Sequence, residues 1–236
     1  MKTTHIHQLS SLKRALSKRM PLHRFSFQTM LTIFVLLLLS GCTVVPIEEL
    51  NAARQSAQFD PVAYVDGVWQ SQILPGVIEN AVDAPTVLAA IDADIQKGGE
   101  TYGRFVGGSF NFMVKGQGTI TAVDTSSRNG TMTVKLDGYA GPATIIVQIG
   151  PSISGAALRD AGGVVLFGQF KDQTEFGKIS RELNKRVADE IVGKLDPATL
   201  VGKTVSFSGV FAVSTTNQTT IDLSTITITP VAIDLQ

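Results

Sequence analysis

Residues 172–195 read Asp172-Gln-Thr-Glu-Phe-Gly-Lys-Ile-Ser-Arg-Glu-Leu-Asn-Lys-Arg-Val-Ala-Asp-Glu-Ile-Val-Gly-Lys-Leu195, and they form the clearest amphipathic segment of this 236-residue chain. Their large apolar side chains recur at steps of three or four residues, which is the period of a helix with one buried face; they are Phe176, Ile179, Leu183, Val187 and Ile191. Asp172, with Glu175 three residues later, resembles a capping box, and Gly193 and Pro197 bound the far end. We therefore predict one long helix with a single apolar stripe.

Strand patterns lie on both sides of this helix. Alternating or β-branched residues predict three strands before it and two after it, at residues 110–123, 132–136, 143–149, 203–214 and 224–235. Asn129-Gly130 is a hairpin signal between the first two strands. A short extra strand is expected at residues 164–167. Five strands with one helix between the third and the fourth is the layout of an OB-fold. We therefore predict a mainly β (α+β) domain with an OB-like five-stranded barrel; the alternative is an unrelated β-sandwich with a packed helix.

Two helices are expected ahead of the strands. Asp60-Pro61 predicts a helix start, and the apolar stripe that follows, which includes Trp69, stops near Pro75-Gly76. Pro85 opens a second helix that ends at Gly98-Gly99. Residues 60–100 are thus predicted to be a helical extension, and residues 101–236 the OB-like barrel domain.

The first 41 residues have the composition of an export signal. They carry six basic residues, no acidic residue and all three histidines, and their unbroken apolar run, residues 33–39, is shorter than the roughly 18 residues of a membrane span. Leu39-Ser40-Gly41-Cys42 resembles the lipobox of bacterial lipoproteins, in which cleavage falls before the cysteine and its thiol receives diacylglycerol. We therefore predict a signal peptide at residues 1–41, lipidation of Cys42 and a tether at residues 42–59.

Three features of this region leave alternatives. An uncleaved signal anchor with an incidental cysteine is the alternative to lipidation. Met1 and Met20 both remain open as the start, because Met20 would give a leader of more ordinary length. Thr43, rather than Asp, follows Cys42, and in lipoproteins of this class that implies sorting to the outer membrane rather than the inner one.

The composition after the leader excludes several classes of chemistry. Cys42 is the only cysteine, so residues 43–236 contain neither cysteine nor histidine. A Ser-His-Asp triad, a Cys-His dyad and a zinc site built from Cys or His are therefore excluded. The whole chain has 20 bases and 20 acids, so residues 42–236 carry 14 bases and 20 acids, and this net charge of −6 disfavours nucleic acid. We predict no catalytic residue, no metal and no cofactor; a hydrolase that uses carboxylates alone is the least favoured reading.

The segment from Val147 to Ala161 carries a resemblance to a known family. It reads Val147-Gln-Ile-Gly-Pro-Ser-Ile-Ser-Gly-Ala-Ala-Leu-Arg-Asp-Ala161, and with Phe167, Phe170, Gln173-Thr-Glu-Phe176 and Gly202-Lys-Thr-Val205 it resembles a family of predicted bacterial periplasmic lipoproteins, domain of unknown function 2291. The resemblance covers nearly all of the chain after the leader. It departs from the family pattern at Ser154 and Asp172, where the family has a bulky basic residue and an Asn. Members are commonly encoded beside sugar-uptake transporters of the ATP-binding-cassette (ABC) type, which implies a transporter component as a partner, besides the membrane.

Five residues of this segment are candidates for a ligand site or a structural loop: Gln148, Gly150, Gly155, Arg159 and Asp160. The planar fork of Arg159 could hold a carboxylate, a phosphate or sugar hydroxyls. In the structural alternative, which we favour, Arg159 binds loop carbonyls and Asp160 pins a turn. Arg159 and Asp160 are not expected to face each other, because they are adjacent on a helix.

These observations lead to two functional hypotheses of different classes. The first is a lipid-anchored, non-enzymatic periplasmic accessory or binding lipoprotein linked to a sugar ABC uptake system. The alternative is an envelope structural or assembly lipoprotein that binds other proteins and no small ligand.

Overall fold

The predicted long helix is present and changes its winding near the end. The structure is a computed structural model that describes Ile47, residues 59–216 and residues 221–236, so the predicted leader and Cys42 lie outside the described residues, as does most of the predicted tether. Helix α8 spans Gln173–Arg186, continues as a π-helical turn over Val187–Ile191 and ends as a 3-10 turn over Val192–Lys194.

The start of α8 is capped in a way that differs slightly from a capping box. Asp172 Oδ1 accepts hydrogen bonds from the backbone N–H groups of Thr174 (2.8 Å) and Glu175 (2.9 Å). The Glu175 carboxylate accepts from the backbone N–H of Lys171 (3.0 Å), one residue before the cap. These bonds satisfy N–H groups that a helix start leaves without partners.

Five strands form a closed ring of pairings. They are β3 (Ser109–Asp124), β4 (Thr131–Leu136), β5 (Thr144–Gln148), β6 (Thr204–Ser214) and β7 (Thr225–Leu235). The ring runs β3-β4-β5-β7-β6 and returns to β3; its pairs are antiparallel except β5 with β7, which is parallel. The five predicted strands therefore lie where the sequence placed them, to within one or two residues.

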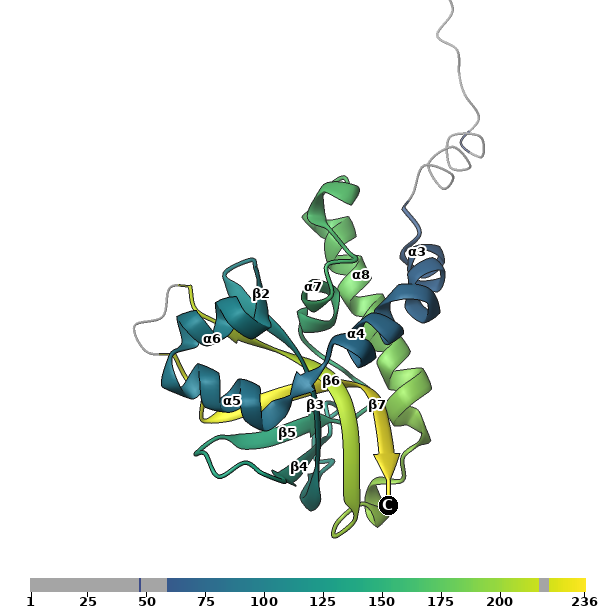
Figure 1. Cartoon of the computed structure of the whole chain (residues 1–236). Coiled ribbons are helices and arrows are strands. Elements are labelled where there is room, and N and C mark those ends of the chain that lie inside the picture. Colours follow the sequence, from purple (N-terminus) through teal and green to yellow (C-terminus); the bar gives the residue numbers. More distant parts are fainter. Residues whose placement is uncertain (1–46, 48–58, 217–220) are drawn as a thin grey trace, which may run out of the picture. The chain divides into compact units, whose positions relative to one another are not determined.

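Two short strands were not predicted, and one predicted strand is wrong. β1 (Val82–Asp83) runs parallel to β3, and β2 (Gly103–Val106) runs antiparallel to it. The described part of the chain thus has seven strands in a mixed α+β fold (Figure 1). Residues 164–167 do not form a strand: Phe167 begins a 3-10 turn (Phe167–Gln169), and the Gln169 side chain accepts from the backbone N–H of Leu166 (2.8 Å). This local bond occupies a backbone donor that a sheet would need.

Strand β3 is long because it changes partner along its length. Residues 109–119 pair with β6, and residues 118–124 pair with β4, with a register shift between Ile120 and Ala122. Gly118 lies where both partners approach, and a Cβ atom there would lie 2.3 Å from the Lys135 carbonyl oxygen. Only glycine allows such a close approach of two backbones.

The N-terminal helical region has more pieces than the two predicted helices. They are α3 (Pro61–Val68), a π-helical turn (Trp69–Ile73), α4 (Leu74–Asn80), α5 (Ala84–Ala93) and α6 (Ile95–Tyr102). The first helix does not stop at Pro75-Gly76. The Leu74 N–H reaches back to the Trp69 carbonyl in the π-helical turn, and Pro75 then falls in the first turn of α4, where a proline needs no N–H partner.

The second predicted helix breaks at Asp94 rather than ending at Gly98-Gly99. Asp94 is extended, and its carboxylate caps α6 by accepting from the backbone N–H groups of Gln96 and Lys97, both at 3.0 Å. Gly98 and Gly99 lie inside α6 as packing residues: a Cβ on Gly98 would lie 2.9 Å from the backbone of Ala90, and one on Gly99 would lie 2.5 Å from the Phe110 ring.

The helices cover the strands through two separate hydrophobic cores. In the first, α5 packs against the inside of the ring through Val87, Leu88 and Ile91. In the second, the predicted stripe of α8 packs against α3, α4 and the outer residues Val210 and Val231 of β6 and β7. Figure 1 shows α5 and α6 on one side of the strands and α3, α4 and α8 on the other. Trp69 lies in the second core, 1% exposed, and donates to Glu190 Oε2 (2.9 Å).

Candidate functional site

Arg159 and Asp160 form a buried ion pair on the one-turn helix α7 (Ala157–Ala161). Arg159 Nε donates to Asp160 Oδ1 (2.6 Å) and Nη2 donates to Oδ2 (2.8 Å), while the two residues are only 8% and 6% exposed. The guanidinium carbon lies 3.6 Å from the centre of the Phe176 ring. The expectation that these side chains do not face each other is therefore wrong, because the long arginine side chain folds back over a helix of a single turn.

The other candidate residues fasten the loop between β5 and α7. Gln148 Nε2 donates to Thr229 Oγ1 (2.8 Å) and to the Ser154 carbonyl (3.1 Å), and Gln148 Oε1 accepts from the Ser154 N–H (2.9 Å). The Gly155 carbonyl accepts from Asn184 Nδ2 (2.9 Å), which ties the loop to α8. Gly150 packs so tightly on the β3–β4 turn that a Cβ atom would lie 2.4 Å from the Arg128 carbonyl oxygen.

The structure thus brings Arg159 and Asp160 together and gives Gln148 and Gly155 partners within the protein. In the structural alternative Arg159 binds loop carbonyls and Asp160 pins a turn, whereas here Arg159 donates to Asp160 and to the Phe176 carbonyl of α8 (3.4 Å). A structural role for these residues therefore stays a prediction. A ligand role for these five residues stays a prediction as well.

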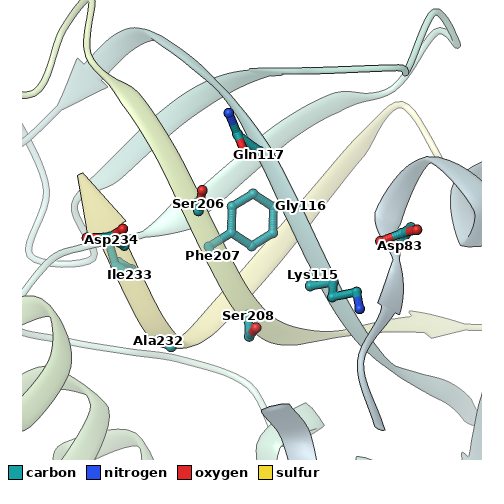
Figure 2. Close-up of a pocket in the computed structure, with 10 residues that line it drawn as sticks. All are labelled: Asp83, Lys115, Gly116, Gln117, Ser206, Phe207, Ser208, Ala232, Ile233 and Asp234. Atoms are coloured by element: carbon teal, nitrogen blue, oxygen red, sulfur yellow. The ribbon is translucent and has the colours of Figure 1, made fainter. Parts of the chain in front are cut away.

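A groove lined by six polar residues lies over the outer surface of four neighbouring strands. It has a volume of about 450 Å³, and we name it the polar groove (Figure 2). Its polar lining residues come from β1, β3, β6 and β7, and they are Asp83, Lys115, Gln117, Ser206, Ser208 and Asp234. None of the five candidate residues lines this groove.

Strand register explains why these side chains meet. Lys115 is paired with Asp83 on one side and with Ser208 on the other, and Ser206 is paired with Gln117 and Asp234. Paired residues point to the same face of a sheet, as do residues two apart on one strand. The two rows therefore lie side by side along the groove.

The groove lies over side chains of the first core, and its charges are spread out. A Cβ atom on Gly116 would lie 2.6 Å from Leu136 and 2.9 Å from the Phe207 ring, so this glycine makes room for two side chains of the first core beneath the groove. Figure 2 shows Asp83 and Asp234 at opposite ends of the groove, with Lys115 nearer Asp83. Such a site offers separate hydrogen-bond donors and acceptors to a polar molecule or protein surface. It does not present two carboxylates to one bond, as glycosidase-type acid–base chemistry requires.

Sequence reasoning missed the polar groove. Its signal was the run of polar residues at alternate positions, 115 and 117 in one strand and 206 and 208 in another. A second hollow, of about 500 Å³, lies between the Ile149–Pro151 loop and the end of the long helix; of the five candidates, only Gly150 lines it.

Neither a metal-binding cluster nor a membrane-spanning helix is found among the residues that the structure describes. Within residues 59–216 and 221–236, no group of three or more His, Cys, Asp or Glu side chains is placed to hold a metal ion. No helix in the same part of the chain combines the length and the apolar character that crossing a bilayer demands.

Comparisons with known proteins give one family and one fold. A family model described as "Predicted periplasmic lipoprotein (DUF2291)" matches residues 32–234. A search of curated proteins gives no match. The chain is similar to the crystal structure of an OB-fold protein from Thermotoga maritima, with 21% identity, 76% of this chain and 99% of that chain covered, and a TM-score of 0.57. At that identity the likeness concerns the fold alone, and it supports the predicted OB-like order of strands.

Proposed function

Because the chain belongs to this family of predicted periplasmic lipoproteins, we propose that it is a lipid-anchored accessory or binding protein, without enzymatic activity, that serves a sugar ABC uptake system. Cys42 is the proposed acylation site, and the envelope is the proposed location, with the outer membrane favoured by Thr43. The observation that carries the non-enzymatic part is the absence of histidine and cysteine from residues 43–236, since these are common general bases and nucleophiles.

The polar groove is the proposed contact surface. We interpret the ring of five strands as an OB-like barrel whose outer face carries this groove. Lys115 and Gln117 offer donors, and Asp83 and Asp234 offer acceptors, beside the apolar lining residues Ala232 and Ile233. Donors and acceptors beside apolar residues suit a sugar, and they equally suit the polar rim of a solute-binding protein.

The test is a binding measurement with a matched pair of double variants. The mature protein is immobilised, and retention of the cognate solute-binding protein and of candidate sugars is measured. Lys115→Ala with Asp234→Ala should weaken binding at least about tenfold, because each removes a charged contact. Asp92→Ala with Lys97→Ala removes one exposed charge of each sign on α5 and α6 and should leave binding unchanged. Equal binding by both double variants would contradict the assignment of the groove. Failure to retain any transporter component or sugar would contradict the transport link.

The alternative function is an envelope structural or assembly role through protein contacts. It is favoured by the position of the groove on an open face of the strands rather than in a closed cavity. Deletion of the gene separates the two readings. General detergent sensitivity is expected for an assembly role, whereas a growth defect on a single carbon source is expected for a transport role.

The anchor and its membrane are tested on native material. Mass spectrometry should show acyl groups on Cys42 and no residue before it. Membrane fractionation should place the protein in the outer membrane, and Thr43→Asp should move it to the inner membrane. An unmodified Cys42 would contradict the anchor, and an unchanged distribution of Thr43→Asp would contradict the sorting argument.

A further inference from the structure

An aromatic and aliphatic surface lies where the predicted tether enters the folded part of the chain. We name it the tether-side patch, and its residues come from the start of α3 and from the loop before α8: Phe59, Tyr64, Leu166, Phe167 and Phe170. Two of them are large apolar side chains with much of their surface exposed: Phe167 (52%) and Leu166 (45%). Exposed apolar side chains that gather in one place commonly mark an interaction site.

The rings of the patch pack as one continuous cluster. Phe170 is central: its ring centre lies 5.4 Å from that of Phe59, 5.2 Å from that of Tyr64 and 5.6 Å from that of Phe176. Phe167 continues the cluster outward, with its ring centre 5.4 Å from that of Phe176. The exposed Phe167 is therefore supported from beneath by buried aromatic residues.

Hydrogen bonds hold the exposed loop in place. Gln169 Oε1 accepts from the Leu166 N–H (2.8 Å) and from the Tyr64 hydroxyl (3.1 Å). The same side chain thus joins the loop before α8 to helix α3. Because both elements are fixed, the fold presents Leu166 and Phe167 to the outside in a defined geometry.

We propose that the tether-side patch rests on the membrane that holds the lipid anchor, with Leu166 and Phe167 inserted into its interfacial layer. The inference rests on the proposed anchor at Cys42. Sixteen residues separate Cys42 from Phe59, and even a fully extended chain of that length reaches only about 55 Å. The chain enters the fold at Phe59, inside the patch, so the anchor keeps this surface at a high effective concentration near the bilayer. Aromatic and aliphatic side chains are the ones that bind at the membrane–water interface.

The charges around the patch indicate which lipids it meets. Asp172 follows Lys171 in the loop before α8, and Asp60 caps α3 next to Phe59. Both signs are present, so the rim gives no strong attraction to anionic headgroups. Insertion should therefore depend on apolar contact and be insensitive to anionic lipid and to salt.

The test places a fluorescent residue in the patch of the mature, acylated protein. Phe167→Trp is reconstituted in vesicles of phosphatidylethanolamine and phosphatidylglycerol, with and without bromine-labelled acyl chains, which quench tryptophan within the bilayer. The matched control is Val201→Trp, because Val201 is 59% exposed and follows the far end of the long helix. The unsubstituted protein supplies the background of the buried Trp69.

The proposal expects the added emission of Phe167→Trp to fall at least about twofold with brominated lipid, and that of Val201→Trp to stay unchanged. The fall should persist in vesicles without phosphatidylglycerol and at high salt. Equal quenching of both variants, or of neither, overturns the proposal. A blue-shifted but unquenched Phe167→Trp would show that residues 43–58 or a second copy of the chain cover the patch, and it overturns the proposal as well. These outcomes are independent of binding to a transporter component. Acylation of Cys42 is verified by mass spectrometry before reconstitution, which separates a failed anchor from a failed patch.

Discussion

Asp160→Asn should destabilise the protein strongly, although it changes only one carboxylate oxygen to an amide nitrogen. In the folded protein both carboxylate oxygens accept charged hydrogen bonds from Arg159. The substitution removes the negative charge, and the amide would have to turn one donor group toward the guanidinium. Arg159, which is 8% exposed, would then hold a buried charge without a counterion.

The burial of the Arg159–Asp160 pair sets the expected loss of stability. The two side chains are 9% and 8% exposed, so the pair belongs with buried ion pairs, for which loss of one partner costs about 3–5 kcal/mol. An exposed pair would contribute only about 0–1 kcal/mol. The contact of Arg159 with the Phe176 ring contributes up to about 2 kcal/mol in a desolvated site. Because this contact is already present in the native state, it does not compensate for the lost carboxylate. For a domain of this size, each kcal/mol shifts the Tm by about 2–4 °C, so the Tm should fall by about 6–20 °C.

Chemical denaturation followed by far-ultraviolet circular dichroism, together with calorimetry, measures this loss. Asp189→Asn is the matched control, because Asp189 pairs with Lys185 on an exposed face of the long helix, and it should leave the stability nearly unchanged. Arg159→Met with Asp160→Leu should recover most of the loss, since an apolar pair needs no counterion. A loss below about 1 kcal/mol for Asp160→Asn would refute the reasoning. It would show that water reaches the guanidinium, and it would reopen ligand binding by Arg159.

Four further substitutions, one of them a control, test separate parts of the fold. Gly118→Ala should lower the free energy of unfolding by about 1–3 kcal/mol, because its Cβ would clash with the Lys135 carbonyl. The control Gly67→Ala, which has open space around it in α3, should raise the free energy of unfolding by about 0.5–1 kcal/mol. Equal effects of the two substitutions in chemical denaturation would contradict the packing argument. Gln148→Leu should cost about 1–3 kcal/mol, because Thr229 and Ser154 lose a buried partner, and an unchanged denaturation midpoint would argue for a ligand role. Backbone hydrogen bonds, first that from Glu175, lower the pKa of Asp172 below its ordinary 3.8, so its stabilising effect is present above that pH and is lost as the pH falls through the lowered value. Asp172→Asn keeps a capping oxygen without a titrating group, so its stability should fall less steeply in acid than that of the unsubstituted protein, and parallel acid-denaturation curves would exclude this role.

The sequence was sufficient for the long helix and the five ring strands because each carries its own period. The Phe176–Ile191 stripe and the alternation in strands such as residues 132–136 are local patterns that burial reinforces. β1 and β2 have two and four residues, which is too short for a period, and they exist because β3 offers them an edge. The π-helical turn before Pro75 and the break at Asp94 depend on individual hydrogen bonds that residue periodicity does not describe.

The candidate site was harder to predict because its geometry depends on long-range pairing. Arg159 and Asp160 stood out in the sequence, but whether they meet a ligand or each other depends on a single side-chain conformation over Phe176. The residues of the polar groove, in contrast, did not stand out in the sequence. Ser206 or Asp234 taken alone is an ordinary outward residue of a strand. They line one surface with Asp83 and Lys115 only because four strands pair in a given register.

The two proposed surfaces lie toward opposite ends of the long helix, and this arrangement makes the two proposals compatible. The tether-side patch adjoins the start of α8, where Phe167 packs on Phe176. From Gln173 to Lys194 the helix runs for 22 residues, or about 33 Å at 1.5 Å per residue. Near its far end, the π-helical turn Val187–Ile191 contacts β7, the strand that carries Ile233 and Asp234 of the polar groove. If the patch rests on the bilayer, the groove therefore faces the periplasm, where a soluble partner can reach it without displacing lipid. A protein lying with the groove against the membrane would leave Phe167 in water, and the fluorescence of Phe167→Trp separates these two orientations.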